Sequence, residues 1–512
     1  MGVERDTPEI RFARSNGARL AWQEFGSGDE TVIAIPPAAQ NIETAWEWPE
    51  LRAMFERFGS FCRYVHYDKR GTGASDRGRG VPGLDERVDD LRAVMDAAGV
   101  ERAHLFAQSE GGATTLLFAA TYPHRVKTLI MNGSAARLVS SDKVGDPEFR
   151  AQQIEARRRF ADAWGTPETM SIGLFAPSYL GREDFLDWYV RYERTAASSE
   201  DVFDLMVQML DMDVADVVPE IEAPMLVLHR RNDPAMPIEL GRELVELARD
   251  AVLVEFDGDD HFPFVGDSEP MYAEMERWVT GTVAGRSWSI GGGGAPAGPS
   301  APTAPSVTTL GRFGVTVGGE EVDAATWGSR RARVLLKRLV VAEGRPVTRD
   351  ELFDLLWPDE TDRARLGSRL SVQLSAVRRV LGGGVVADRD TVALDHDVVS
   401  VDLSSYLAAV EAGDEHRVLE RYGEFLPEHR YDDWAHAMRE RVRSSFTVAA
   451  HRVATAALDA DEHERALDLG RRILDTDPSD SLAHATVVDA LEAMGDVAAA
   501  DRQRAAWRDT DG

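Results

Sequence analysis

The stretch from Ala103 to Pro123 limits the folds that the chain can adopt more than any other segment does. Its sequence, AHLFAQSEGGATTLLFAATYP, passes from an apolar strand into an apolar helix with only Gln108 to Gly112 between them. Ser109 therefore lies on the turn itself, where a sharp strand-to-helix connection holds a serine in a strained conformation with its hydroxyl above the sheet. In isolation such a sequence would read as a polar loop, but its flanks favour the turn. We predict that Ser109 is a nucleophile.

A serine nucleophile needs a base and an orienting acid within hydrogen-bond reach. Asp233 follows the strand in MLVLHRRND, and His261 follows the strand in VLVEFDGDDHFPF. Both lie just past a strand end, on the edge where Ser109 is expected. The sequence therefore predicts a catalytic triad of Ser109, His261 and Asp233. An Asp-Pro pair also begins turns, which is the alternative interpretation of Asp233.

Strands alternate with helices through this half of the chain, which predicts a doubly wound, mostly parallel sheet covered on both faces. The expected strands are 31–35, 63–67, 104–107, 127–131, 224–229 and 251–256, with a hairpin over 10–25. A mostly helical insertion at about 134–222 follows the strand at 127–131. Its position predicts a cap over the serine.

The stretches YDKRGTGASD, SEGGATTLLFAATYP and GDDHFPFVGD resemble the α/β-hydrolase superfamily, over about residues 10–282. The nearest resemblance is to hydrolase domains fused to bacterial signalling proteins such as class III cyclases. A serine nucleophile points to cleavage of an ester, thioester or lactone. The usual His-Gly after the third strand is Pro36-Pro37 here, and proline has no amide hydrogen. We therefore expect the oxyanion hole to use the backbone amides of Ala38 and Glu110; a slow enzyme or a sensor without turnover remains open.

Composition limits the other functions of the chain. The sole cysteine, Cys62, excludes disulfide and cysteine-zinc schemes, and we expect no cofactor and no metal. The N-terminus lacks the features of a signal peptide, and no run reaches the ~18 apolar residues of a membrane span. These features predict a cytoplasmic protein without membrane contact. The net charge of −30 disfavours nonspecific nucleic-acid binding by the whole chain.

Charge and composition divide the chain into parts. Residues 1–285 carry 30 basic and 50 acidic side chains, whereas residues 305–403 carry 14 and 15. A segment rich in Gly, Pro, Ala and Ser joins them. We predict an α/β-hydrolase domain over 1–285, a linker over 286–306, a DNA-binding domain over 307–403 and a helical domain over 404–512.

The third part has the element order of a winged helix-turn-helix. A β segment over 307–317 precedes predicted helices at 329–342, 348–356 and 363–381, and a hairpin near 385–394 follows. One face of the longest helix carries small and basic residues that suit a major groove; a solvated basic face is the alternative. The predicted contacts to double-stranded DNA are Arg365, Ser368, Arg369, Val372, Ser375 and Arg379 on this helix, with Arg330, Arg331 and Arg389 on phosphates.

DELFDLLWPDE and RLSVQLSAVRRVLGG resemble the OmpR/PhoB-type DNA-binding domain of SARP-type (AfsR-like) transcription activators. After residue 404, two units offset by 34 residues are typical of tetratricopeptide-like helix pairs. That region resembles the bacterial transcriptional activator domain of the same family. The resemblance implies RNA polymerase as a partner and leaves homodimerisation open.

Together these features predict a DNA-binding transcription regulator whose N-terminal serine hydrolase domain senses a small ester, lactone or acyl ligand; whether it also hydrolyses that ligand stays open. One alternative is an active carboxylic-ester hydrolase whose C-terminal half serves protein interaction. The other is a scaffold that has lost both chemistries.

Overall fold

The computed structural model describes residues 7–78, 80–139, 143, 146–281, 304–360 and 363–510. The predicted linker over 286–306 lies almost wholly outside them. The chain forms two compact units. The first combines the described part of Met1–Gly298 with Thr348–Arg379 and Ala387–Val392, and the second holds the described part of Pro299–Val347, Val380–Val386 and Ala393–Gly512.

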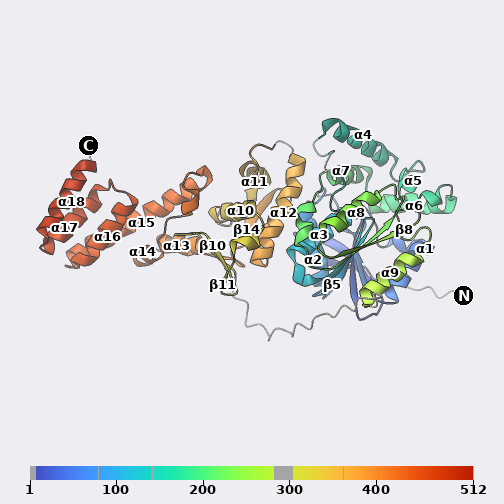
Figure 1. The fold of residues 1–512 in the computed structure, drawn as a ribbon, viewed down its shortest axis with the longest axis horizontal. Helices are drawn as coiled ribbons and strands as arrows, with labels where there is room; N and C mark the ends of the chain where they lie inside the picture. The colour runs from blue at the N-terminus through green and yellow to red at the C-terminus, as the bar shows by residue number, and fades with distance from the viewer. Residues whose placement is uncertain are drawn as a thin grey trace. The chain divides into compact units, whose positions relative to one another are not determined.

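An eight-stranded sheet of order β1-β2-β4-β3-β5-β6-β7-β8 forms the centre of the first unit (Figure 1). Its strands are β1 (Arg11–Ser15), β2 (Ala18–Phe25), β3 (Thr31–Ile35), β4 (Arg63–Tyr67), β5 (Ala103–Gln108), β6 (Val126–Asn132), β7 (Met225–Arg230) and β8 (Ala251–Phe256). β2 pairs with β1 and with β4, in both cases antiparallel. The other neighbours in the sheet, from β4 through β3, β5, β6 and β7 to β8, are parallel. The predicted mostly parallel sheet is confirmed.

Helices cover both faces of this sheet because its strands are apolar on both sides. On β3, Val32 and Ala34 join one buried cluster while Ile33 and Ile35 join the other, as the two-residue period of a strand requires. The first cluster includes side chains of α1 (Pro49–Gly59) and α9 (Glu269–Thr280). The second includes those of α2 (Leu84–Ala97), α3 (Gly111–Thr121) and α8 (Ile238–Leu247).

The insertion between β6 and β7 is helical, as predicted. It contains α4 (Pro147–Ala163), α5 (Ser171–Phe175), α6 (Glu183–Ala196) and α7 (Ser199–Met209), with short 3-10 turns at Pro177–Tyr179 and Ala215–Glu220. Other 3-10 turns lie at Thr44–Glu47 and Pro123–Arg125. We refer to α4 through α7 as the cap.

The segment after the predicted linker begins with strands β9 (Ser306–Thr308), β10 (Gly314–Val317) and β11 (Glu320–Glu321), which form a four-stranded sheet with β15 (Ser400–Val401). A 3-10 turn, Ala324–Trp327, leads to α10 (Arg330–Val341). β12 (Val347–Thr348), α11 (Arg349–Leu356), α12 (Arg363–Leu381), β13 (Val385–Ala387) and β14 (Thr391–Leu394) follow. This order matches the predicted helices and hairpin, and the winged-helix assignment itself stays a prediction.

The rest of the chain is helical. It comprises α13 (Asp402–Glu411), α14 (Glu415–Arg421), a 3-10 turn at Pro427–His429, α15 (Asp433–Asp459), α16 (His463–Thr476), α17 (Ser481–Ala493) and α18 (Val497–Thr510). From α15 to α18 each helix packs on the next one along the chain. The tetratricopeptide-like assignment remains a prediction. Within the described residues, no helix is long and apolar enough to cross a bilayer.

Candidate active site

Ser109 occupies the turn between β5 and α3 in a left-handed backbone conformation, with φ of +53°. Its amide donates to Asn132 O at 3.1 Å, and its carbonyl accepts from Ser134 Oγ at 2.6 Å. A Cβ atom at Gly111 would lie 2.8 Å from Pro36 O, so only glycine lets the helix start this close to β3. This is the strained geometry of a nucleophile on a strand-to-helix turn.

Asp233 and His261 are paired at the ends of β7 and β8. His261 Nδ1 lies 2.7 Å from Asp233 Oδ2, and both side chains are buried. Asp233 Oδ1 accepts from the amides of Ala235 and Met236 at 2.9 and 3.0 Å. The carboxylate therefore closes a turn and orients a histidine at the same time.

Burial alone would raise the pKa of Asp233, but the hydrogen bond and charge of His261 and the two backbone amides outweigh it. The pKa of Asp233 is held below its ordinary value. An ionised carboxylate on Nδ1 leaves Nε2 as the base, as a triad requires.

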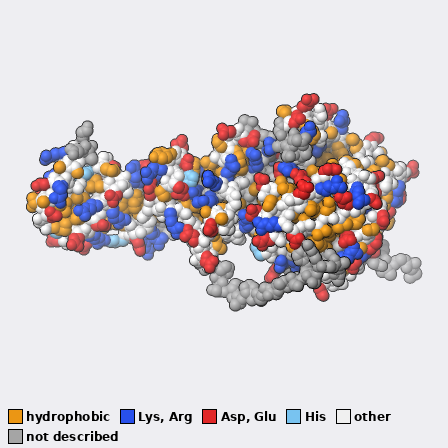
Figure 2. Space-filling view, viewed as in Figure 1, with side chains coloured by type: hydrophobic (Ala, Val, Ile, Leu, Met, Phe, Trp, Pro, Cys, Tyr) orange, Lys and Arg blue, Asp and Glu red, His pale blue; other side chains and the backbone are white. Residues whose placement is uncertain are grey.

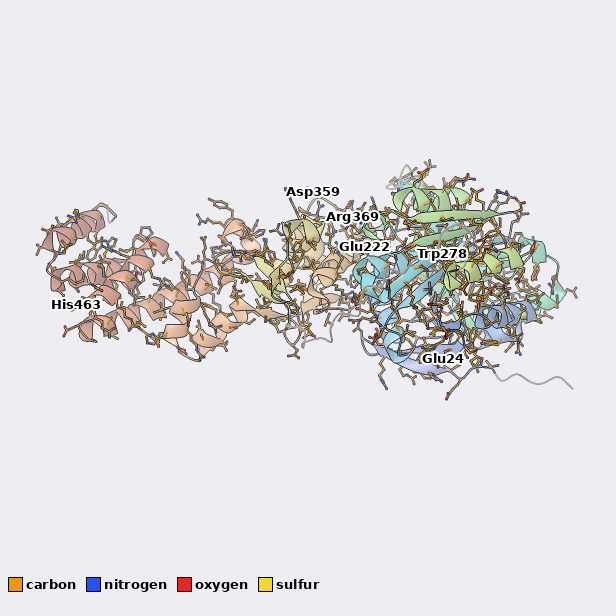
Figure 3. The ribbon with its side chains drawn as sticks, turned by 60° about the horizontal axis from the view of Figure 1, so that its bottom comes forward. Glu24, Glu222, Trp278, Asp359, Arg369 and His463 are labelled. Atoms are coloured by element: carbon orange, nitrogen blue, oxygen red, sulfur yellow. The ribbon has the colours of Figure 1, made fainter. Side chains whose placement is uncertain are left out.

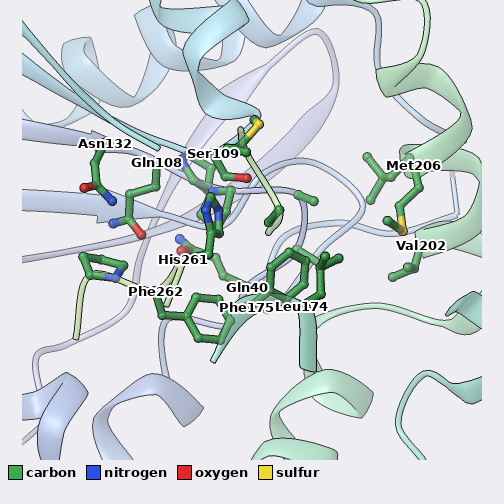
Figure 4. Close-up of a pocket in the computed structure, with 18 of the residues that line it drawn as sticks. Gln40, Gln108, Ser109, Asn132, Leu174, Phe175, Val202, Met206, His261 and Phe262 are labelled. Carbon is green, nitrogen blue, oxygen red and sulfur yellow. The ribbon is translucent and has the colours of Figure 1, made fainter. Parts of the chain in front are cut away.

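Ser109 and His261 line the same cavity (Figure 4). Between these two described side chains the structure has no hydrogen bond; in unliganded enzymes this contact often tightens only around substrate. The cavity measures about 430 Å³ and is mostly apolar. Leu174, Phe175, Val202 and Met206 of the cap contribute to its wall (Figure 4). The apolar part of an acyl chain fits such a lining.

The two predicted oxyanion donors come from the loop after β3 and from the turn that carries Ser109. Ala38 lines the cavity just after Pro36 and Pro37, and Glu110 directly follows Ser109. Neither amide donates to another group among the described residues. Both are therefore available to an oxygen bound beside Ser109.

The Glu110 side chain is buried away from this role. It pairs with Arg87 Nη1 at 2.8 Å and with Lys69 Nζ. Burial acts to raise the pKa of Glu110, but the Arg87 and Lys69 cations outweigh it and hold that pKa low. Burial lowers the pKa of Lys69 to about 8, so the lysine is still mostly charged at neutral pH. Sequence reasoning missed both cations, although a glutamate between an apolar strand and an apolar helix signals the need for partners.

Arg230, which sequence reasoning also missed, holds the loop that carries His261. Its buried guanidinium donates from Nη1 to Asp260 O and Phe262 O at 2.7 and 2.9 Å, and from Nη2 to Val265 O at 2.6 Å. The His261 amide donates to Phe175 O of the cap at 2.9 Å. The histidine is thus fixed from the sheet and from the cap.

Fold and site together define a domain of the serine-hydrolase type, and comparison with known proteins agrees. The model of the alpha/beta hydrolase family matches residues 32–274. The N-terminal half of the chain is an α/β-hydrolase domain.

Two curated proteins and one solved structure are similar to this chain. A bifunctional esterase/perhydrolase of Acinetobacter calcoaceticus is 24% identical over 257 residues, 48% of this chain and 90% of the relative. A putative carbamate hydrolase of Caulobacter sp. (strain K31) is 26% identical over 264 residues, 50% of this chain and 94% of the relative. A thermophilic esterase structure from Thermogutta terrifontis is 21% identical, with a TM-score of 0.44, and covers 53% of this chain and 98% of its own.

The predicted DNA-contacting residues of α12 make contacts within the first unit. Ser368 Oγ donates to Asp211 O at 2.7 Å, and Ser375 Oγ lies 2.5 Å from Thr121 Oγ1. Arg379 lies 3.5 Å from Glu220. Val372 packs against the buried cluster that includes α2 and α3. This side of α12 is therefore occupied rather than open in the structure.

The other predicted DNA contacts are more accessible. Arg369 is exposed on α12 (Figure 3). It pairs with Glu360 at 3.3 Å. Arg365 is half-buried on the same helix. Arg330 and Arg331 are exposed at the start of α10, and Arg389 is exposed in the turn between β13 and β14. On the face drawn in Figure 2, basic and acidic side chains are interspersed.

Among the described residues, no group of three or more His, Cys, Asp and Glu side chains is arranged to hold a metal ion.

Proposed function

We propose that the N-terminal domain hydrolyses small carboxylic esters, thioesters or lactones through an acyl-serine intermediate. The observation that carries the proposal is the strained Ser109 in the same cavity as His261, whose other ring nitrogen is held by buried Asp233. The names of the two sequence relatives, a bifunctional esterase/perhydrolase and a putative carbamate hydrolase, support a hydrolytic reaction.

Each group has one task in this reaction. Ser109 Oγ attacks the acyl carbon while His261 Nε2 takes its proton, and Asp233 stabilises the imidazolium that forms. The Ala38 and Glu110 amides bind the oxyanion. As the intermediate collapses, His261 gives the proton to the departing alcohol or thiol. His261 then takes a proton from water, which attacks the acyl-serine, and returns that proton to Ser109 Oγ as the acid leaves.

The test is a panel of p-nitrophenyl esters of increasing acyl length, assayed with the full chain and with Ser109→Ala. We expect turnover by the wild type and a loss of at least about 1000-fold in the variant, with an unchanged circular dichroism spectrum. Equal rates in the two proteins would leave the cavity as a binding site without catalysis.

A second candidate function, DNA binding by the segment from β9 to β15, is favoured by one observation. The three helices and the hairpin follow in winged-helix order, with exposed Arg330, Arg331 and Arg389 at the positions expected to meet phosphates. On this proposal the chain is a cytoplasmic regulator that binds an acyl ligand in the hydrolase domain and RNA polymerase through the C-terminal half, alone or as a homodimer. The alternative gives the C-terminal half to protein interaction.

Mobility-shift titration against genomic fragments decides between these two. If DNA is bound through α12, Arg369→Ala and Arg379→Ala each weaken binding by about 1–3 kcal/mol where they meet base edges, and less where they meet phosphate. Unchanged affinity in both variants would remove α12 from the interface and favour the protein-interaction alternative.

A further inference from the structure

Arg157, on the cap helix α4, is unlike every other residue around the catalytic cavity. Of the described residues that line the cavity, it is the one Lys, Arg, Asp or Glu; the others are apolar or uncharged polar groups. The domain as a whole is acidic, with 30 basic and 50 acidic side chains over residues 1–285. A cation in this cavity is therefore not a consequence of a generally basic surface.

Arg157 also differs from its neighbours on α4. Arg150, Arg158 and Arg159 lie within 2.6, 2.7 and 3.5 Å of Asp211, Glu200 and Glu155, respectively. Arg157 has no carboxylate within 4.0 Å among the described residues. Burial lowers the pKa of the Arg157 guanidinium. Arginine nevertheless stays charged, so the cavity wall carries a cation without an acidic partner.

Part of the guanidinium is held by the cap. Nε donates to Met206 O at 2.9 Å in the last turn of α7, and Nη1 donates to Gln153 O and Gln153 Oε1 at 3.1 and 2.6 Å. Nη2 has no hydrogen-bond partner among the described residues and is not fully buried. These contacts orient the group and leave donor capacity for a ligand. The two N–H groups of Nη2 can donate to a carboxylate.

A partly buried cation without a counter-ion is costly, and an anion in the cavity would offset that cost. The carbonyl of Met206 accepts a hydrogen bond from Arg157. Figure 4 shows Met206 on one side of the cavity and Gln108 and Asn132 on the other, with Ser109 nearer to these two. An anion at Arg157 would therefore belong to a part of the substrate away from the serine.

We propose that the cavity takes esters that carry a carboxylate at the end remote from the scissile carbonyl, and that Arg157 binds this carboxylate. The proposal rests on the ester hydrolysis proposed for Ser109. Substrates of this chemistry are half-esters of dicarboxylic acids and acyl chains with a terminal acid. Their apolar middle would lie along the cap side chains that line the cavity.

The kinetic test compares mono-p-nitrophenyl esters of succinate, adipate and suberate with the same esters in which the free carboxylate is a carboxamide. The measured quantity is the ratio of kcat/KM for each acid to that for its amide. We expect the wild type to prefer the acid for at least one chain length, and Arg157→Gln to lower that ratio by about 10- to 100-fold, the loss expected for a hydrogen bond to a charged group. Arg157→Lys, which keeps the charge, should recover part of the ratio.

The matched control is Arg158→Gln, one residue along the same helix, whose partner Glu200 lies outside the cavity lining. This variant should leave the ratio unchanged. A ratio that does not move in Arg157→Gln, even if both rates fall together, would show that Arg157 only holds α7, and would overturn the proposal.

Calorimetric titration with adipate and adipamide separates this proposal from the hydrolysis on which it rests. We expect adipate to bind the full-length wild type more tightly than adipamide does, and Arg157→Gln to remove the difference. If no ester is hydrolysed, the proposed catalysis fails while Arg157-dependent adipate binding still supports the anion site. If adipate and adipamide bind alike to the wild type, the anion site is wrong whatever the esterase result.

Discussion

The catalytic edge of the sheet and the buried side of α12 use similar side chains for different ends. At the edge, a serine, a histidine and an aspartate gather around one cavity with free backbone amides beside them. On α12, serines and arginines pair with side chains of the acidic helix α2: Ser371 Oγ lies 2.7 Å from Asp85, and Arg378 lies 2.8 Å from Asp89. Composition alone does not separate a reactive site from a structural contact; the difference is whether the polar groups face a cavity or each other.

The largest expected effect is a loss of activity at the catalytic edge, caused by a change at Asp233. Asp233→Asn keeps an oxygen for the amides of Ala235 and Met236 but presents an amide to His261, which favours the wrong tautomer. We expect kcat to fall by about 10,000-fold with little change in stability. Steady-state kinetics and thermal unfolding measure the two quantities. Full activity would reduce Asp233 to the turn-forming role that its sequence also allows.

The oxyanion hole gives the next largest effect. Ala38→Pro removes one amide hydrogen beside Ser109, and we expect a loss of about 100- to 1000-fold in kcat. Ala38→Gly keeps the amide and serves as the control for packing. If the proline variant is as active as the glycine variant, the second donor is not Ala38.

A smaller effect, on the free energy of unfolding, is expected at the buried contact between α12 and α2. Asp89 and Arg378 are both buried, and Asp89 also lies 3.3 Å from Arg92, so removing either partner weakens the compensation of a buried charge. A double-mutant cycle with Asp89→Ala and Arg378→Ala in the full chain should give a coupling energy of about 1–3 kcal/mol in urea unfolding. Additive effects would mean that this side of α12 is not held against α2 in solution.

The occupied side of α12 also bears on DNA binding. If α12 contacts DNA through Ser368 and Ser375, its contacts with the hydrolase domain have to open first, because both serines are engaged there. Deleting residues 1–290 should therefore raise DNA affinity at low salt and abolish any response to an acyl ligand, whereas Ser109→Ala should keep that response. Equal affinities for the full-length and truncated chains would separate the two functions.

A last effect concerns acid stability. Burial lowers the pKa of His66 from 6.5 to about 3. Between these values the unfolded chain binds a proton that the folded chain does not, so the free energy of unfolding falls as the pH drops below about 6.5, by up to about 1.4 kcal/mol per pH unit. His66→Gln should flatten this slope in urea titrations between neutral and mildly acid pH. Exposed His436→Gln should leave it unchanged, and an unaltered slope in both variants would place the acid sensitivity elsewhere.

Much of the hydrolase domain could be predicted from sequence because its signals are local. The strand and helix around Ser109 determine the turn, and Asp233 and His261 follow strand ends whose common edge is set by the parallel sheet. Arg230, Arg87 and Arg157 were not predicted, because each acts through partners distant in sequence and no period or motif marks them. The contacts of α12 were missed for the same reason: a helix face that suits DNA also suits an acidic helix.

The central claim is that Ser109 is a nucleophile activated by His261. Incubation of the full chain with a fluorophosphonate, followed by peptide mass spectrometry, tests it directly without knowledge of the substrate. We predict one covalent adduct per chain on Ser109, formed at least about 100-fold more slowly in His261→Ala. An unlabelled Ser109, or labelling at the same rate without His261, would contradict the account.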